Sequence, residues 1–316
     1  MDQRTIGSLN VSLIGLGCNN FARKIDQPAS TAVVAAALDS GITLFDTADR
    51  YGGGDRPFSG EGRSEEFLGR ALGSHRGEVV VATKFGQPMG DDPADRGGGR
   101  DWVLRACEGS LRRLGTDYID LYMIHFPDPD TPVAETVGAL TELVERGMVR
   151  EIGCSNFTGE MLRESDAASR ENGYARFVSV ENEYSLLRRE MEEDVLPVCQ
   201  ELGLELLPYF PLASGLLTGR YTRGELPPEG SRLSLWMPRE HFALTEETFD
   251  RVERLSQFAE ARERTVLELA IAWLLANPLI PSVIAGATTP DQVRANAAAA
   301  HWTLTAAELE EVAALT

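Results

Sequence analysis

The feature that most constrains the fold of this chain is an alternation of short apolar runs with longer stretches of helical periodicity. The apolar runs are SLIGLG, ITLFDTA, EVVVATK, YIDLYMIH, MVREIGCSN, RFVSVENEY, LELLPYFPL and LIPSVIAGA. Strands that are apolar on both faces are typical of a parallel sheet covered by helices. Eight strand–helix units close most simply into a barrel, so the sequence predicts an α/β fold of the (β/α)8, or TIM-barrel, type.

The segments between these runs complete the expected unit. Helical stretches are expected at residues 28–40, 64–72, 102–114, 133–146, 158–172, 191–202 and 267–277, and from residue 290 onward. The opening segment TIGSLNVSLIG predicts a short hairpin that plugs the barrel floor. Residues 86–99 predict a surface loop, and residues 214–245 a ligand-covering insertion after the seventh strand. No linker interrupts the chain, so residues 1–316 are expected to form one domain.

Charge and cysteine usage narrow the class of protein. The formal net charge of −19 disfavours binding to nucleic acid or to an anionic membrane, because phosphates would be repelled. The four cysteines are far apart and have no CxxC spacing, which predicts reduced core residues. The chain shows no secretory signal and no apolar segment of ~18 residues, so a cytoplasmic protein is expected.

Polar residues follow the ends of successive predicted strands. Asp46 ends the second strand, Lys84 the third and His125 the fourth, and Tyr51 follows in the loop after Asp46. Each has an ordinary explanation when taken alone: a turn-forming Asp, a solvated Lys, a packed His. Because the carboxyl ends of barrel strands meet at one mouth, the four are instead expected to form one site.

These residue types suit the reduction of a carbonyl group. Tyrosine has an ordinary pKa near ~10, so it carries a proton at neutral pH. A neighbouring ammonium stabilises the phenolate that remains after donation, and Asp46 would offset the burial of Lys84. A neutral His125 could orient the carbonyl oxygen by donating a hydrogen bond. No side chain supplies a hydride, so the site requires a cofactor.

The chain as a whole resembles the aldo-keto reductases. The resemblance is carried, in order, by FDTADRYGGG, VATKFG, DYIDLYMIHFPDPDTP, VREIGCSNF, VENEYSLL, PYFPLASGLLTGRY and GATTPDQVRAN. It is greatest to the branch that contains the potassium-channel β subunits. It implies a (β/α)8 barrel that reduces aldehydes or ketones, or catalyses the reverse oxidation, with NADP(H) preferred and NAD(H) possible. It also implies that Asp46, Tyr51, Lys84 and His125 form the catalytic tetrad, with Tyr51 as the general acid.

The resemblance also implies positions for the cofactor. Ser155 and Asn156 match the pair that binds the nicotinamide carboxamide, and Tyr209 matches the aromatic residue that stacks on the nicotinamide. The remaining positions match the pyrophosphate-binding backbone, the adenosine contacts and the basic residues that would hold the phosphates, namely Leu212, Ser214, Gly215 and Leu217, then Gly286, Thr288, Gln292 and Asn296, and finally Arg220 and Arg232.

Two positions depart from the family pattern. Glu181 stands where the family usually has Gln, a cofactor-binding position, and Ala295 stands where it often has Glu near the adenine. An ionised Glu cannot donate a hydrogen bond to the carboxamide oxygen as Gln does. Its charge would favour the cationic, oxidised nicotinamide, so Glu181 is expected to favour retention of NADP⁺.

The substrate is expected to be a small carbonyl compound or alcohol. The candidate wall residues suit an apolar or aromatic compound, or a sugar that stacks by its flat face: Asn20, Phe21, Phe126, Phe157 and Trp236. One alternative is an NADP(H)-binding, redox-sensing regulatory protein on the same scaffold. A metal-dependent hydrolase is a further alternative, but the four histidines show no paired spacing, and no metal is expected. The sequence leaves the oligomeric state open.

Overall fold

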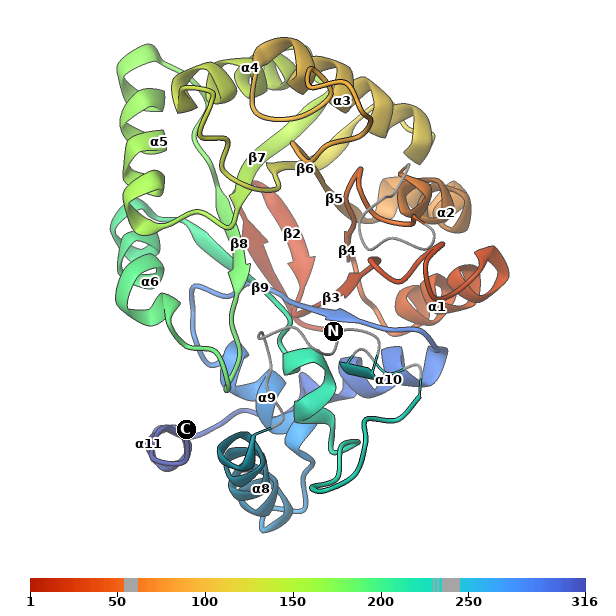
Figure 1. Ribbon diagram of the computed structural model, residues 1–316, viewed down its shortest axis with the longest axis vertical. Helices are drawn as coiled ribbons and strands as arrows, with labels where there is room; N and C mark the ends of the chain where they lie inside the picture. The colour runs from red at the N-terminus through yellow and green to blue at the C-terminus, as the bar shows by residue number, and fades with distance from the viewer. Residues whose placement is uncertain (54–61, 230, 232, 235–244) are drawn as a thin grey trace.

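Eight parallel strands form a ring in the computed structural model, which describes residues 1–53, 62–229, 231, 233–234 and 245–316 (Figure 1). Their order is β10-β3-β4-β5-β6-β7-β8-β9. The strands are β3 (Ile14–Gly17), β4 (Leu44–Asp46), β5 (Val80–Phe85), β6 (Ile119–Ile124), β7 (Val149–Ser155), β8 (Ser179–Glu183), β9 (Glu205–Tyr209) and β10 (Val283–Gly286). The prediction of a TIM-type barrel is confirmed.

The first and last strands of the barrel meet through β10. This strand pairs with β3 along its whole length, from Val283 opposite Ile14 onward. Its other edge faces β9, where the backbone N–H of Leu206 donates to the carbonyl of Leu279 at 2.7 Å, just before β10 begins. These contacts bring the two ends of the strand order together, so that all strands point their carboxyl ends toward one mouth.

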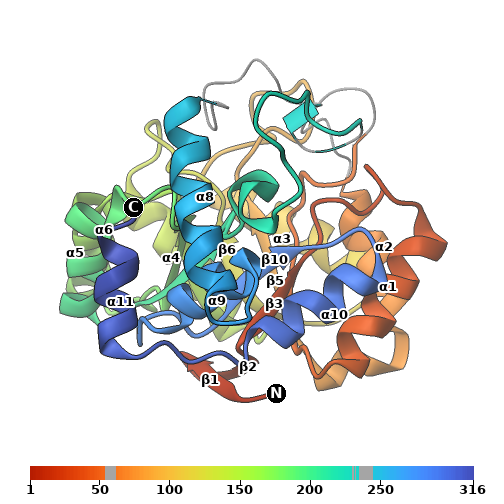
Figure 2. The same cartoon turned by 90° about the horizontal axis from the view of Figure 1, so that it is seen from below.

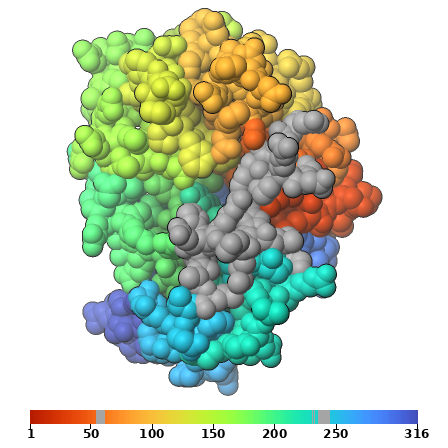
Figure 3. All heavy atoms as spheres, viewed as in Figure 1, coloured from red at the N-terminus to blue at the C-terminus, as the bar shows by residue number. Residues whose placement is uncertain are grey.

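The helices surround the barrel. The expected helices are present as α1 (Gln27–Asp39), α2 (Arg63–Leu72), α3 (Arg100–Leu114), α4 (Val133–Glu145), α5 (Gly159–Asn172), α6 (Met191–Leu202), α9 (Val266–Leu275) and α10 (Pro290–Ala299). Two more helices, α8 (Glu246–Glu260) and α11 (Ala306–Ala313), have no counterpart in the sequence prediction. They lie at the outer edge of the molecule (Figure 3).

Local capping explains where the additional helices begin. The Thr305 side chain accepts from the Glu308 backbone N–H, and the Glu308 carboxylate accepts from the Thr305 backbone N–H. This capping box is readable as T-x-x-E in the sequence, so α11 was predictable. Thr245 caps α8 in a similar way, by accepting from the Thr248 backbone N–H.

A hairpin closes one end of the barrel, as expected. It consists of β1 (Gln3–Ile6) and β2 (Leu9–Ser12), and it lies beside the N-terminus at the end opposite the mouth (Figure 2). Ile6, Leu9 and Val11 are buried against barrel residues that include Leu44, Leu121, Met123 and Ile284. This core is distinct from the larger one between the strands and the helices. The plug leaves the opposite mouth as the open end.

The expected loop is present at residues 86–99, whereas the expected insertion at residues 214–245 lies partly outside the described residues. Residues 86–99 contain neither helix nor strand, and half of them are exposed. The seventh barrel strand, β9, is followed by the short 3-10 helix η2 (Ala213–Thr218) and then by the insertion that leads to α8. Another short 3-10 helix, η1 (Gly73–Glu78), follows α2. In the described part of the chain, no helix is both long enough and apolar enough to span a bilayer.

Candidate active site

The strand ends bring the predicted tetrad to the open mouth of the barrel. Asp46 is the last residue of β4, Lys84 is the last but one of β5, and His125 directly follows β6. Tyr51 follows β4 in the next loop and lines the same cavity as Asp46 and His125. Lys84 lies behind them and has no exposed surface. The parallel strands therefore bring the four predicted residues together at one mouth, as the sequence predicts.

Lys84 is held between two carboxylates. Its Nζ pairs with Asp46, donates to the carbonyl of Thr47 at 3.1 Å, and lies 3.2 Å from Oε2 of Glu181. Burial opposes the charge on the amine, but Asp46 and Glu181 raise the pKa of Lys84 well above its usual range. Lys84 is therefore an ammonium throughout the ordinary pH range, as its proposed role requires.

Glu181 and Asp46 compete for this single ammonium. Burial, reinforced by the nearby Asp46 carboxylate, raises the pKa of Glu181 to about 8. Burial also raises the pKa of Asp46, against the opposing effect of Lys84. Two carboxylates beside one lysine thus retain a proton near neutral pH. The expected ionised form of Glu181 is therefore dominant only at pH values above about 8.

The two rings of the tetrad lie beside the ammonium. Nζ of Lys84 is 5.5 Å from the centroid of the Tyr51 ring, and the Tyr51 and His125 rings meet edge to face with centroids 5.6 Å apart. Burial, with a contribution from Lys84, lowers the pKa of His125 well below its usual range. The imidazole is therefore neutral at neutral pH and can donate a hydrogen bond without carrying a charge. Phe126 stacks on His125 at 5.1 Å and is half exposed at the mouth.

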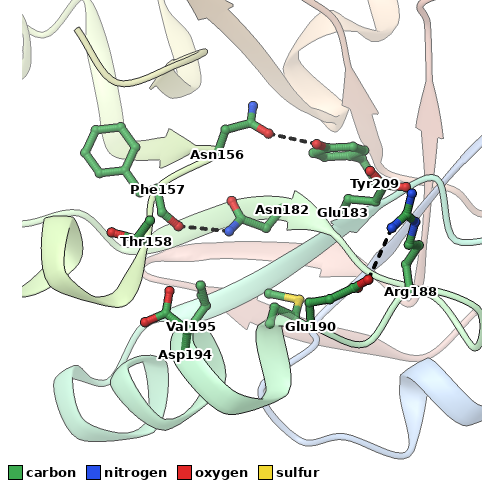
Figure 4. A pocket seen from close by; sticks show the side chains of 11 residues that line it. Asn156, Phe157, Thr158, Asn182, Glu183, Arg188, Glu190, Asp194, Val195 and Tyr209 are labelled. Carbon is green, nitrogen blue, oxygen red and sulfur yellow. Dashed lines mark hydrogen bonds and ion pairs between the residues drawn. The ribbon is translucent and has the colours of Figure 1, made fainter. Parts of the chain in front are cut away.

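Asn156 links three of the strands that surround the site. Its Nδ2 donates to the carbonyl of His125 at 2.8 Å and to Oγ of Ser155 at 3.0 Å. Its Oδ1 accepts from the Tyr209 hydroxyl at 2.7 Å (Figure 4). Both amide protons are used, so only oxygen lone pairs of Asn156 and Ser155 remain for a ligand. This pair can therefore accept hydrogen bonds from an NH2 group.

A cavity of about 1250 Å³ connects the tetrad with the region after β9 and the start of α10. Most of the predicted cofactor residues line it: Ser155, Asn156, Glu181, Tyr209, Leu212, Ser214, Gly215, Arg220, Gly286, Thr288, Gln292 and Asn296. Of the predicted substrate residues, Asn20 and Phe126 line it as well. One continuous cavity therefore holds the residues predicted for proton transfer and for the cofactor.

Several predicted residues lie elsewhere. Phe21 is fully buried in the main core, where its loop bends back to form a bridge with Ile25. Phe157 packs edge to face on Phe177 at 5.9 Å and lines a separate cavity of about 360 Å³ beside Tyr209 (Figure 4). Leu217 is buried in the core and does not line the larger cavity. Both rings pack in the core, so neither lines the larger cavity in this structure.

Two predicted residues lie outside the described part of the chain, and some residues that line the cavity were not predicted. Arg232 and Trp236 lie outside the described residues. Asn19, Lys24 and Gln87 line the cavity but were not predicted. Asn19 and Gln87 follow the ends of β3 and β5, so the strand-end rule applied to the tetrad would have found them. Lys24 lies farther from a strand end, so this rule would not have found it.

Within the described residues, no group of three or more His, Cys, Asp or Glu side chains is arranged to hold a metal ion. The cysteines are free and buried: Cys18, Cys107, Cys154 and Cys199.

Comparison with known proteins identifies the family to which this cavity and these residues belong. Residues 13–316 match the family model of the Aldo/keto reductase family. The chain belongs to this family. It is therefore an aldo-keto reductase-family oxidoreductase, and the family generally uses nicotinamide cofactors.

Relatives cover nearly the whole chain. Aldo-keto reductase YhdN of Bacillus subtilis (strain 168) is 35% identical over 311 residues, which cover 96% of this chain and 89% of the relative. A probable voltage-gated potassium channel subunit beta of Oryza sativa subsp. japonica is 33% identical, with coverage of 94% and 90%. An NADH-specific methylglyoxal reductase of Escherichia coli (strain K12) is 32% identical, with coverage of 98% and 96%. These similarities include the predicted branch.

A solved structure shows the same fold. The glycerol dehydrogenase AKR11B4 of Gluconobacter oxydans aligns with a TM-score of 0.84 at 29% sequence identity. The alignment covers 99% of this chain and 94% of the other. This chain and that structure therefore share their fold over nearly their whole lengths.

Proposed function

We propose that this protein is an NADP(H)-dependent oxidoreductase that reduces aldehyde or ketone carbonyls to alcohols, or runs the reverse reaction, with Tyr51 as the general acid. The observation that carries the proposal is the arrangement at the mouth of the barrel. A phenol and a neutral imidazole line one cavity, with a buried ammonium directly behind them. This combination polarises a carbonyl oxygen and protonates it.

Each member of the tetrad has a separate role in the proposal. Tyr51 donates its proton to the carbonyl oxygen, and the Lys84 ammonium stabilises the phenolate that remains. Asp46 holds the Lys84 amine in place through their ion pair. His125 donates a hydrogen bond to the same carbonyl oxygen, since its low pKa keeps it neutral. In the oxidation of an alcohol, the Tyr51 phenolate accepts the proton.

The residues along the cavity fit a nicotinamide dinucleotide. A bound nicotinamide supplies the hydride that no side chain can provide. Ser155 and Asn156 offer acceptors to a carboxamide NH2, and Tyr209, held by Asn156, offers an aromatic face. Farther along, the small residues Ser214 and Gly215 let the backbone form the cavity wall, which suits a pyrophosphate. The start of α10 would hold the adenosine end.

The preference for NADP(H) rests on Arg220. It lines the cavity and is exposed, so it can meet a 2′-phosphate in a molecule that is otherwise strongly acidic. Arg232 is the second proposed phosphate contact. NAD(H) remains the alternative cofactor, because one relative is named for its NADH specificity. The free, buried cysteines support the cytoplasmic location expected from the sequence.

Replacement of Tyr51 tests the proposal directly. In Tyr51→Phe, reduction of a panel of aldehydes should slow by about a hundred- to ten-thousand-fold, the usual contribution of a positioned general acid. The rate is followed by NADPH absorbance, and cofactor affinity by fluorescence. Tyr118→Phe is the matched control, because Tyr118 packs under Arg76 and Arg150 and does not line the cavity.

Two results would contradict the proposal. Unchanged turnover in Tyr51→Phe would exclude Tyr51 as the acid. Tight NADPH binding without turnover of any carbonyl compound or alcohol would favour the regulatory alternative, which is supported by relatives named as channel subunits.

A further inference from the structure

The side chain of Glu181 makes a contact that the Gln usual at this position in the family could not make. It lies on β8, across the barrel from β5, and it is buried at the cavity wall. Its carboxylate reaches the Lys84 amine, with Oε2 and Nζ 3.2 Å apart. The Gln expected at this position could not form an ion pair. Glu181 therefore belongs to the electrostatic surroundings of the tetrad as well as to the proposed cofactor site.

We propose that Glu181 is a positioning residue for the proton donor, acting through Lys84 to set how strongly the ammonium stabilises the Tyr51 phenolate. The inference rests on the proposed role of Tyr51. It goes beyond that role because it assigns control of the acid to a residue at which this chain departs from the usual family pattern.

The charges around Lys84 support the proposal. Asp46 on β4 and Glu181 on β8 both contact its amine, and the centroid of the Tyr51 ring lies 5.5 Å from it. Two ionised carboxylates outweigh one ammonium, so the buried group then carries a net negative charge. A net negative charge opposes the formation of a phenolate nearby. With Glu181 protonated, the group is neutral and this opposition disappears.

The other titratable groups near Asp46, Lys84 and Glu181 do not change their charge near neutral pH. Tyr209 on β9 faces Glu181, and burial raises its pKa above the usual range, so it stays uncharged. Cys18, directly after β3, lies near Asp46 and Lys84, and burial raises the pKa of its thiol as well. His125, directly after β6, is neutral at neutral pH because burial lowers its pKa. Ionisation within the Asp46–Glu181 pair, in which the pKa of Glu181 is raised to about 8, is therefore the event that changes the charge beside Lys84 near neutral pH.

The sign of the effect follows from these charges. Above pH values of about 8, the wild-type protein carries the Glu181 anion, which counteracts Lys84 and holds the proton on Tyr51. Glu181→Gln removes that anion and keeps the size of the side chain. The phenol in the variant should therefore ionise about one pH unit lower than in the wild type, an effect typical of one nearby charge.

The test is a titration of the phenol itself in the protein without cofactor or substrate. The full-length protein is labelled with isotopes in its tyrosine rings and followed by NMR as the pH rises, and Tyr51→Phe identifies the Tyr51 signal. The matched control is Glu183→Gln. It makes the same chemical change two residues farther along β8, where Glu183 lines the smaller cavity instead (Figure 4).

The expected result is a lower titration midpoint for Tyr51 in Glu181→Gln and an unchanged midpoint in Glu183→Gln. The pH profile of alcohol oxidation should move in the same direction, since the phenolate is the base in that reaction. An unchanged Tyr51 midpoint in Glu181→Gln would overturn the inference, even if the affinity for the cofactor changed. The midpoint is measured without turnover, so it tests the inference independently of the proposed function. If only the proposed function failed, Glu181→Gln would still shift the midpoint, but the protein would have no activity.

Discussion

At the scale of single residues, the site depends on how buried charges compensate one another. Lys84 has no exposed surface, and its ammonium is paired with carboxylates from two other strands. A buried ion is tolerated only with such partners. One carboxylate is enough to neutralise the Lys84 ammonium. The second carboxylate, Glu181, adds a negative charge when ionised, and its protonation changes near neutral pH. Ionisation of Glu181 should therefore change both the free energy of unfolding and the catalytic activity.

This ionisation predicts how stability depends on pH. The pKa of Glu181 rises from the ordinary value of 4.5 to about 8 in the folded protein, so the folded state binds the proton more tightly. The stabilisation is complete at pH values below 4.5 and is lost as the pH rises through about 8. The loss is on the order of a few kcal/mol, since each pH unit of pKa change is worth about 1.4 kcal/mol.

Urea unfolding of wild type and Glu181→Gln across this pH range measures the effect. The variant should lose less stability than the wild type as the pH rises, because Gln does not titrate. Parallel stability curves for the two proteins would show that Glu181 keeps its ordinary pKa in the fold.

At the scale of elements, the segment after β9 shapes the proposed pyrophosphate site through an unusual backbone. Ala213, Ser214 and Gly215 in η2 all have positive φ, at +45°, +57° and +99°. Gly215 also approaches Tyr221 closely, and an added Cβ would lie 3.2 Å from that ring. The Tyr221 hydroxyl donates to the Ser214 carbonyl at 3.2 Å, so the ring is held in place. Both conformation and space therefore favour glycine here.

Two alanine substitutions separate the effect of backbone conformation from the effect of limited space beside Tyr221. Gly215→Ala adds backbone strain and a contact with Tyr221 at the cavity wall. Gly219→Ala, at φ +73°, adds strain but meets nothing within 4 Å. Both should destabilise the protein by about 1 kcal/mol or more from the strain alone. Only Gly215→Ala should also weaken NADPH binding, measured by fluorescence titration. Equal affinities in the two variants would argue against a cofactor role for this segment.

At the scale of the whole molecule, a net charge of −19 opposes the binding of any phosphate-bearing ligand. The cationic side chains among the described cavity residues are Lys24 and Arg220. If the proposed cofactor preference holds, discrimination between NADPH and NADH should depend on a few local charges that act against the field of the whole protein. Because Arg220 is exposed, its contribution should be sensitive to salt.

Arg220→Gln tests this balance. The ratio of NADPH to NADH affinity should fall by about tenfold, in keeping with the loss of one charge-assisted phosphate contact. The difference should shrink as salt is added. The control is Arg223→Gln, which removes the same charge from a side chain that pairs with Glu246, Asp250 and Glu253 on α8. A similar fall in both variants would mean that net charge, and no specific phosphate contact, sets the preference.

By itself, the sequence determined the barrel, the plugging hairpin and the position of each tetrad residue. These features follow from local rules: apolar periodicity sets the strands, and the ends of parallel strands must meet at one mouth. The helix α11 was equally readable, because its capping box lies within four consecutive residues.

Only the tertiary structure decided which side chains meet across the barrel. The contact between Glu181 and Lys84 joins β8 to β5, strands that are not neighbours in the sheet, so no local pattern encodes it. Packing likewise placed the rings of Phe21 and Phe157 away from the larger cavity, although both follow strand ends. Local periodicity specifies where a strand ends, whereas burial and long-range electrostatics depend on residues that only folding brings together.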